Sequence, residues 1–479
     1  MNLRKAPAYP VLAERTRNRP LGVVLTAMLL ASCGPVANSS AAPNCETELQ
    51  VDSSRVHGLL LFALAVTEKR YGDSRLRATL MSSPERALSE HEAVQRLRGV
   101  DIDQNSYAYP GMPQWHGATV QPFDAYLTLS RDAESLSDLD EDVVGVLPAE
   151  DHVAIIDALR VLSESYDSLV WEPNREGLLK LNSEVECKAS EVRLQQYLKK
   201  VARFYSAPEL QKVPVRMATS AIGAPGGYRV TIKGSTVVAP LPKQLDDPIK
   251  LLGVVIHEWA HVAYGNQDPK LARQIEHWFE STGKPNQHYA KLWFDEALAT
   301  AVGNLWAYER MARSPQERQP NASPVISRYA HALVPIVTEY MGSERAIDEE
   351  FVKAAALSFE DAFPDAGSDP AVILPHLTVH LDESLLTSRG QIERAFAASL
   401  HPQILIIRKL EHGGEPETKN PGTHLTLRAG PPGEGGKGST VRRDPDGRVL
   451  VELSVEGKVD TDELLSHLHA EVAESRESN

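Results

Sequence analysis

One apolar segment, residues 251–264, restricts the possible folds of this 479-residue chain more than any other feature. Asp247-Pro248 precedes it as an N-cap and a first-turn proline, and Gly265-Asn266 follows it as a stop signal. These signals predict a helix over about 248–264 that is apolar on nearly every side and therefore buried. Three polar side chains interrupt the apolar run, and each of them needs a partner once it is buried.

The three polar residues are His257, Glu258 and His261, which form the pattern HExxH. Residues four apart lie on the same face of a helix, so both imidazoles can bind one metal ion. Glu258 is displaced by about 100° around the helix. It can therefore reach a water molecule on that metal and act as a general base. The alternative is a core helix whose two histidines are satisfied by backbone carbonyls.

The residues after His261 exclude one version of this site. In a metzincin peptidase, the eighth motif position is glycine and the eleventh is histidine or aspartate. Here these positions are Tyr264 and Gln267. The third metal ligand must then come from elsewhere, and a second apolar helix, expected from about residue 287 to 311, presents Glu296.

The order of these two motifs resembles the gluzincin metallopeptidases, the group of thermolysin and the membrane aminopeptidases. The likeness covers roughly residues 205–310. It implies that His257, His261 and Glu296 bind one Zn²⁺ and that Glu258 is the base. Thermolysin-like members carry an aspartate four residues after the third ligand, where this chain has Thr300. Asp295 or Thr300 is therefore expected to orient a zinc-bound histidine.

The resemblance also implies a downstream residue that stabilises the tetrahedral intermediate. Tyr340 is our choice for this catalytic role, with Tyr329 and His331 as alternatives. In the family, an edge strand before the HExxH helix pairs with the extended peptide substrate, and residues 228–238 fit that strand. A purely structural strand is the alternative interpretation of these residues.

The N-terminus has the features of an export signal. Residues 1–20 are basic, the run 21–31 is apolar but too short to span a membrane, and Leu30-Ala31-Ser32-Cys33 follows. This ending resembles a bacterial lipobox, which implies cleavage before Cys33 and acylation of its thiol. The protein would then be exported and anchored in the cell envelope, at the outer membrane in a Gram-negative host. An ordinary signal peptide is the alternative.

The formal net charge is −15 at pH 7, and loss of the basic residues 1–32 would make it more negative. No nucleic-acid partner is therefore expected. Cys45 and Cys187 are the other cysteines. In an oxidising compartment they can form a disulfide, worth roughly 4–5 kcal/mol in the chain-entropy model. Two separate buried thiols are the alternative.

The predicted fold class is α+β and mainly helical, with a zincin-like catalytic domain that has a small mixed sheet before the HExxH helix. The predicted parts are a signal peptide (1–32), a tether (33–50), a helical N-terminal region (51–204), the catalytic domain (205–400) and a small C-terminal α/β module (401–479). Two β-like runs, 213–217 and 228–238, are expected to form a hairpin. The stretches 107–113 and 132–142 are expected to be loops, and 404–407, 424–427 and 449–455 to be strands.

The resulting hypothesis is an exported, lipid-anchored zinc peptidase whose partners are a peptide or protein substrate and, through the lipid, a membrane. The competing hypothesis is a non-catalytic lipoprotein that keeps the zinc site and acts as an envelope binding or structural protein. Cleavage of peptides by the zinc-loaded protein would separate the two.

Overall fold

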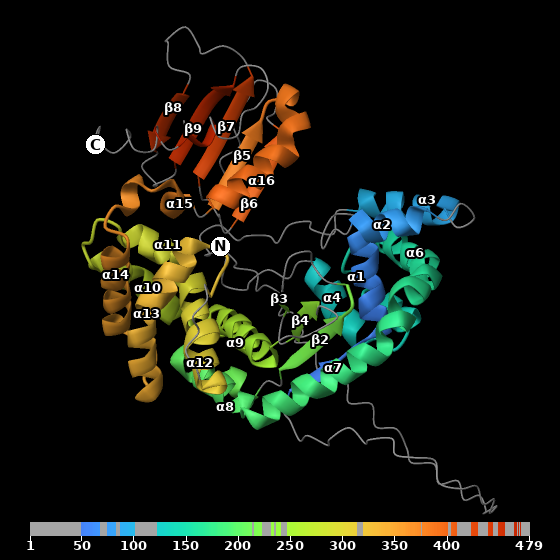
Figure 1. Cartoon of the computed structure of the whole chain (residues 1–479), viewed down its shortest axis with the longest axis horizontal. Helices are drawn as coiled ribbons and strands as arrows, with labels where there is room; N and C mark the ends of the chain where they lie inside the picture. The colour runs from blue at the N-terminus through green and yellow to red at the C-terminus, as the bar shows by residue number, and fades with distance from the viewer. Residues whose placement is uncertain are drawn as a thin grey trace, which may run out of the picture. The chain divides into compact units, whose positions relative to one another are not determined.

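The computed structural model describes residues 49–67, 74–82, 87–100, 122–212, 215–222, 231–233, 236–240, 247–313, 320–374, 376–400, 404–409, 423–429, 439–443, 449–455, 464–466, 468 and 470. They are mainly helical with one four-stranded and one five-stranded sheet, which confirms the predicted α+β class (Figure 1). Cys33, Cys45 and the predicted loop 107–113 lie outside the described residues. Within these ranges, no helix is long and apolar enough to cross a membrane.

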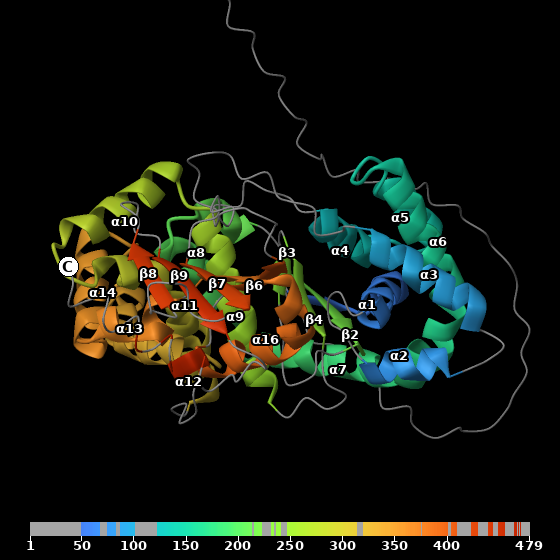
Figure 2. The ribbon, with the colours of Figure 1, turned by 90° about the horizontal axis from the view of Figure 1, so that it is seen from above.

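The first six helices, α1 to α6, lie together (Figure 2) and share one hydrophobic core. Helix α1 is buried along its whole length after the first residue, as expected for a helix that is apolar on every side. It contacts α3, α4 and α6. The bounds are α1 Arg55–Thr67, α2 Ser74–Met81, α3 Ala87–Gly99, α4 Pro122–Asp132, α5 Leu136–Asp142 and α6 Ala149–Tyr166.

The prediction of a loop over 132–142 is wrong, because α5 occupies most of it. Ser135 is the N-cap of α5, and its hydroxyl accepts the backbone N–H of Asp138. The Asp138 side chain in turn accepts the backbone N–H of Ser135 at 3.0 Å. This capping box and the acidic residue in the first turn stabilise a short helix. The acidic composition of the segment had led to the prediction of a loop.

His57 of α1 is fully buried, and its Nδ1 lies 2.9 Å from the Ser130 hydroxyl. Burial lowers its pKa from 6.5 to about 4. The unfolded chain therefore binds this proton more readily, and stability falls as the pH drops through 6.5 towards 4. We expect a loss of about 3 kcal/mol in unfolding free energy across this range. Urea titrations at several pH values should show a shallower acid loss for His57→Gln, and an unchanged slope would contradict this expectation.

A long helical segment leads from this core to the next one. It comprises the π-helix η1 (Asp167–Trp171), α7 (Glu172–Glu191) and α8 (Leu194–Phe204), followed by a 3-10 turn, η2 (Pro208–Lys212). The second half of α7 and all of α8 pack into the second core. Cys187 in α7 is disulfide-bonded. Its predicted partner, Cys45, lies outside the described residues.

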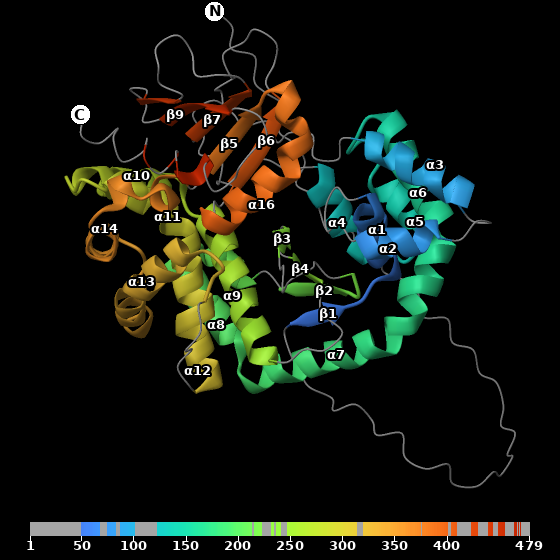
Figure 3. The same cartoon turned by 45° about the horizontal axis from the view of Figure 1, so that its top comes forward.

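The first sheet has the order β1-β2-β4-β3 (Figure 3), with strands β1 Gln50–Asp52, β2 Arg216–Ser220, β3 Thr231–Lys233 and β4 Thr236–Pro240. It is mixed, because β1, β2 and β4 are parallel and β3 is antiparallel to β4. The predicted hairpin of 213–217 with 228–238 is wrong. The second run instead contributes to two strands, β3 and β4, which pair with each other.

The second core is built around α9 (Pro248–Gly265) and the helices that follow it. These are α10 Pro269–Ser281, α11 Gln287–Ala299, the π-helix η3 Thr300–Ala307, α12 Tyr308–Ala312, α13 Pro324–Gly342 and α14 Glu349–Ala362. The predicted helix to residue 311 is thus one continuous helical run with a π-helical segment in its middle. Helix α9 contacts α8, α11, η3 and β3.

The second sheet has the order β6-β5-β7-β9-β8, and only β8 is antiparallel to its neighbour. The predicted strands near 404, 424 and 449 are present, whereas β5, before residue 401, and β8 had no prediction. The bounds are η4 Ala366–Ser368, α15 Pro370–Ile373, β5 His376–Leu381, η5 Glu383–Ser388, α16 Arg389–Ser399, β6 Ile404–Lys409, β7 Thr423–Ala429, β8 Ser439–Arg443 and β9 Val449–Val455.

Candidate metal centre

Helix α9 begins where the sequence predicts. The Asp247 carboxylate accepts the backbone N–H groups of Ile249 and Lys250 at 2.9 and 3.1 Å, and Pro248 occupies the first turn. The other Asp247 oxygen accepts the hydroxyl of Tyr308 at 3.2 Å. The N-cap therefore also joins α9 to α12, which follows the helix that carries Glu296.

Two glycines allow α9 and η3 to approach backbone to backbone. A Cβ atom added to Gly303 would lie 2.4 Å from the backbone nitrogen of His257 and 2.6 Å from the carbonyl oxygen of Gly253. No side chain fits into that space. A π-helical turn shifts the residues that follow it relative to an uninterrupted α-helix, and such turns are frequent at functional sites. The contact therefore fixes the position of His257 relative to the helical run that carries Glu296.

His257, His261 and Glu296 come together at this junction. The Nε2 atoms of the two histidines are 3.2 Å apart. Glu296 Oε1 lies 3.4 Å from Nε2 of His257, and its Oε2 lies 3.1 Å from Nε2 of His261. The three side chains form a group that could hold a metal ion.

The donor set and its spacing both fit a tetrahedral ion. Two imidazole nitrogens and a carboxylate oxygen are borderline ligands of the kind that Zn²⁺ accepts. At bond lengths of about 2.0–2.1 Å and tetrahedral angles, neighbouring ligand atoms are about 3.3 Å apart. The observed separations of 3.1 to 3.4 Å bracket this value. The two Glu296 distances involve different carboxylate oxygens, and one ligand atom from each of the three side chains lies within 4.8 Å of the other two.

Asp295 contacts the ring nitrogen of His261 that faces away from Glu296. Its Oδ2 lies 3.2 Å from Nδ1 of His261, on the opposite side of the ring from Glu296. A carboxylate in this position fixes the histidine tautomer that leaves Nε2 available to a metal. Thr300, the other predicted support, is fully buried and lies 3.4 Å from the Asn321 side chain. Of the two predicted supports, Asp295 is the one in contact with a histidine.

The charges of this cluster change two pKa values in the protein without an ion. Burial opposes the charged form of His261, but the charges and hydrogen bonds of Asp295 and Glu296 outweigh it and raise the pKa of His261 well above its ordinary value. Burial likewise opposes ionisation of Glu296, but the two histidines hold its pKa well below the usual range. A metal ion must therefore displace protons from the site, so its affinity rises with pH.

Asn321 is a site residue that the sequence analysis missed. Its Nδ2 donates to Glu296 Oε1 at 3.1 Å, and its Oδ1 accepts the backbone N–H of Ser323 at 2.9 Å. Ser327 holds its backbone, since the Ser327 hydroxyl donates to the Asn321 carbonyl at 2.9 Å. Asn321, itself held by Ser323 and Ser327, thus orients the glutamate. An asparagine in a loop before a proline-started helix carries no sequence signal for this role.

Loss of the Asn321 side chain is expected to loosen Glu296. Because outer supports of metal ligands typically contribute 10- to 100-fold in affinity, Asn321→Ala should weaken zinc binding by about that factor. Competition titrations against a zinc-chelating dye would measure this. Asn174→Ala is the matched control, since Asn174 donates to a helix carbonyl in the N-terminal part of the chain. Equal zinc affinity in both variants would contradict the orienting role.

Of the two predicted catalytic residues, Glu258 lies next to a metal ligand in the same helix, whereas Tyr340 is bonded elsewhere. Glu258 is half-buried on α9 beside His257. Tyr340 is not brought to the cluster by any contact within the described ranges. Its hydroxyl donates to Asp348, the N-cap of α14, at 2.8 Å, and its ring lies under Arg345 and against Phe351. Burial, followed by the bond to Asp348, raises the pKa of Tyr340.

The two alternatives to Tyr340 gain no support from the structure either. Tyr329 is fully buried and donates to the Ala355 carbonyl at 3.2 Å, while His331 is exposed on α13. No residue in the described part of the chain is therefore identified as the group that stabilises the intermediate.

No protein-family model matches the chain, and neither the curated proteins nor the solved structures give a match. The resemblance to the gluzincins accordingly depends on the motif residues His257, Glu258, His261 and Glu296.

Proposed function

We propose that this protein is a zinc-dependent peptidase with a zincin-like catalytic domain. The observation that carries the proposal is the convergence of His257, His261 and Glu296 at the spacing of a tetrahedral metal site. Asp295 and Asn321 orient two of these ligands, which a chance cluster would not require. The lipobox-like sequence supports export and envelope anchoring through Cys33.

The chemistry follows from the side chains. His257, His261 and Glu296 would hold one Zn²⁺, which supplies a water of pKa near 7 and polarises a carbonyl oxygen. Glu258 follows His257 in the helix and is not one of the three ligands, so the proposal gives its carboxylate the role of the base. It accepts a proton from the attacking water and returns it to the amine nitrogen that leaves.

The edge of the first sheet supports a peptide as the substrate. Strand β3 is the outer strand, pairs with β4 on one side, and contacts α9. Within the described ranges no strand pairs with its other side. An extended peptide that added to this edge would be held by backbone hydrogen bonds beside the helix that carries His257 and His261.

Within the described residues, the Tyr340 hydroxyl donates to Asp348 and makes no contact with the metal ligands. The Tyr329 hydroxyl likewise donates to the Ala355 carbonyl. These two bonds favour the second candidate function, a non-catalytic zinc-site lipoprotein of the envelope.

Cleavage of a broad peptide library by the full chain, read by mass spectrometry, tests the proposed function. We expect cleavage by the zinc-loaded protein, loss of cleavage with 1,10-phenanthroline, and recovery when zinc is restored. A zinc-loaded, folded protein that cleaves no peptide would contradict the peptidase and favour the non-catalytic lipoprotein.

A further inference from the structure

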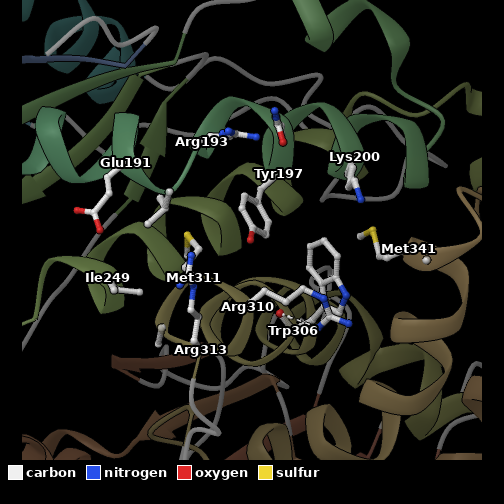
Figure 4. A pocket seen from close by; sticks show the side chains of 14 residues that line it. Glu191, Arg193, Tyr197, Lys200, Ile249, Trp306, Arg310, Met311, Arg313 and Met341 are labelled. Atoms are coloured by element: carbon white, nitrogen blue, oxygen red, sulfur yellow. Dashed lines mark hydrogen bonds between the residues drawn. The ribbon is translucent and has the colours of Figure 1, made fainter.

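A second site lies at the other end of the helices that build the metal centre. It is a pocket of about 750 Å³ between α8 on one side and η3 with α12 on the other (Figure 4). Ile249, in the first turn of α9, also lines it. Pockets that hold small molecules range from about 300 to 1,000 Å³, so the volume suits such a ligand.

The charge of this pocket is opposite to that of the chain. Four cationic side chains line it, namely Arg193, Lys200, Arg310 and Arg313. In the part of the chain that the structure describes, none of the four makes an ion pair. The one carboxylate in the lining, Glu191, is already bonded to Lys188 at 2.5 Å. Four like charges around one space repel one another unless an anion joins them.

An aromatic wall completes the lining. The rings of Tyr197 and Trp306 meet edge to face with centroids 5.7 Å apart, and the guanidinium of Arg310 lies 4.8 Å from the Trp306 ring centre. Arg310 also donates to the Trp306 carbonyl at 3.1 Å, which holds its guanidinium beside the ring. An arginine beside an aromatic surface can bind a ligand with an anionic group and an apolar body.

The backbone holds two of the cations in uncommon conformations. Arg193 and Arg313 have φ values of 57° and 54°, in the left-handed region that favours glycine. Arg193 precedes α8, and Arg313 follows α12. Such strain persists where surrounding structure maintains it, and it is frequent in residues that clamp ligands. Here it occurs at two arginines on opposite sides of one pocket.

We propose that this pocket binds a phosphate ester. A phosphate monoester carries close to two negative charges and three acceptor oxygens at neutral pH, so one such group neutralises two of the four cations. A carboxylate neutralises one. The arginines and Lys200 bind the phosphate, while Tyr197, which packs against the buried Trp306, contacts the organic part. A soluble organophosphate and a phospholipid headgroup share this chemistry.

This pocket is separate from the metal centre. Ile249 is eight residues before His257, which places the pocket about 12 Å along α9 from the metal ligands. None of the four cations belongs to the ligand group. Binding can therefore be measured without catalysis.

Isothermal titration of the full chain with phenyl phosphate, inorganic phosphate and dibutanoyl phosphatidic acid tests the proposal. We expect phenyl phosphate to bind more tightly than inorganic phosphate because of its ring. Tighter binding of the short-chain phosphatidic acid than of phenyl phosphate identifies the lipid headgroup as the source, and the reverse order identifies a soluble ester. Either order supports the proposal.

The double variant Lys200→Gln/Arg313→Gln should weaken binding at least about tenfold, since charged hydrogen bonds are lost. Both side chains are exposed, so the fold should be retained. Arg203→Gln is the matched control, because Arg203 is also exposed on α8 but is paired with Glu344 outside this pocket. Equal binding by the double variant and the control, or no binding of any probe, would overturn the proposal. Equal affinity for inorganic and phenyl phosphate would overturn the organic contact.

Discussion

Replacing Glu258 by glutamine is expected to remove peptide hydrolysis while zinc remains bound. Glutamine has the shape of glutamate but cannot accept the proton of the attacking water. General-base catalysis contributes about 10²- to 10⁴-fold, so kcat should fall by that factor. The ligands His257, His261 and Glu296 are untouched by this change, and zinc content should therefore equal that of the unaltered protein.

The control for this variant is Glu280→Gln, which changes an exposed glutamate on α10 in the same chemical way. Its kcat and zinc content should both be unchanged. Retained hydrolysis in Glu258→Gln would show that another group is the base. Loss of zinc together with loss of hydrolysis would show instead that Glu258 supports the site's structure.

Replacing Gly303 by alanine is expected to damage both stability and zinc binding. The added Cβ would lie 2.4 Å from the backbone nitrogen of His257, a distance that real Cβ contacts essentially never show. The atoms in conflict belong to two helix backbones, so the helices must separate. Overpacking of this kind typically costs 1–3 kcal/mol, and the rigidity of both helices places the expected loss at about 3 kcal/mol or more.

Chemical denaturation and a zinc titration would measure these two effects. Gly177→Ala is the matched control, because Gly177 is also helical but has nothing within 4 Å of the position of a Cβ. Alanine should leave its stability equal or slightly higher, since alanine is the better helix former. A Gly303→Ala protein with the stability and zinc affinity of the control would contradict the close contact between α9 and η3.

Local signals allowed the sequence to predict the centre of the site. An N-cap and a first-turn proline mark the start of α9, and a glycine marks its end. The helical repeat alone then places His257 and His261 on one face. Glu296 followed from the resemblance to a known family, and the structure brings it within 3.4 Å of both histidines.

The parts that were missed depend on contacts between residues distant in sequence. Asn321 and the Glu296 to which it donates are 25 residues apart in sequence. Gly303 is required because its backbone lies against that of α9, a helix that begins at Pro248. The parallel pairing of β2 with β4 likewise requires a crossover that hydrophobic alternation does not reveal. Periodicity predicts which face of an element is buried, but not the element that covers it.

The second sheet also depends on contacts between residues distant in sequence. A rise in glycine content after residue 401 predicted the start of a separate module there. Strand β5, which ends at Leu381, nevertheless lies in the same sheet as β6 and β7. Leu377 and Leu425, from β5 and β7, also belong to the hydrophobic core that contains α9.

The zinc content of the purified full chain at neutral pH is the most direct test of the metal centre. We expect one zinc ion per chain by inductively coupled plasma mass spectrometry, and loss of that zinc in His261→Ala. His277→Ala, which changes an exposed histidine on α10, should keep it. A protein without stoichiometric zinc, or a zinc content that His261→Ala does not change, would contradict the metal centre formed by His257, His261 and Glu296.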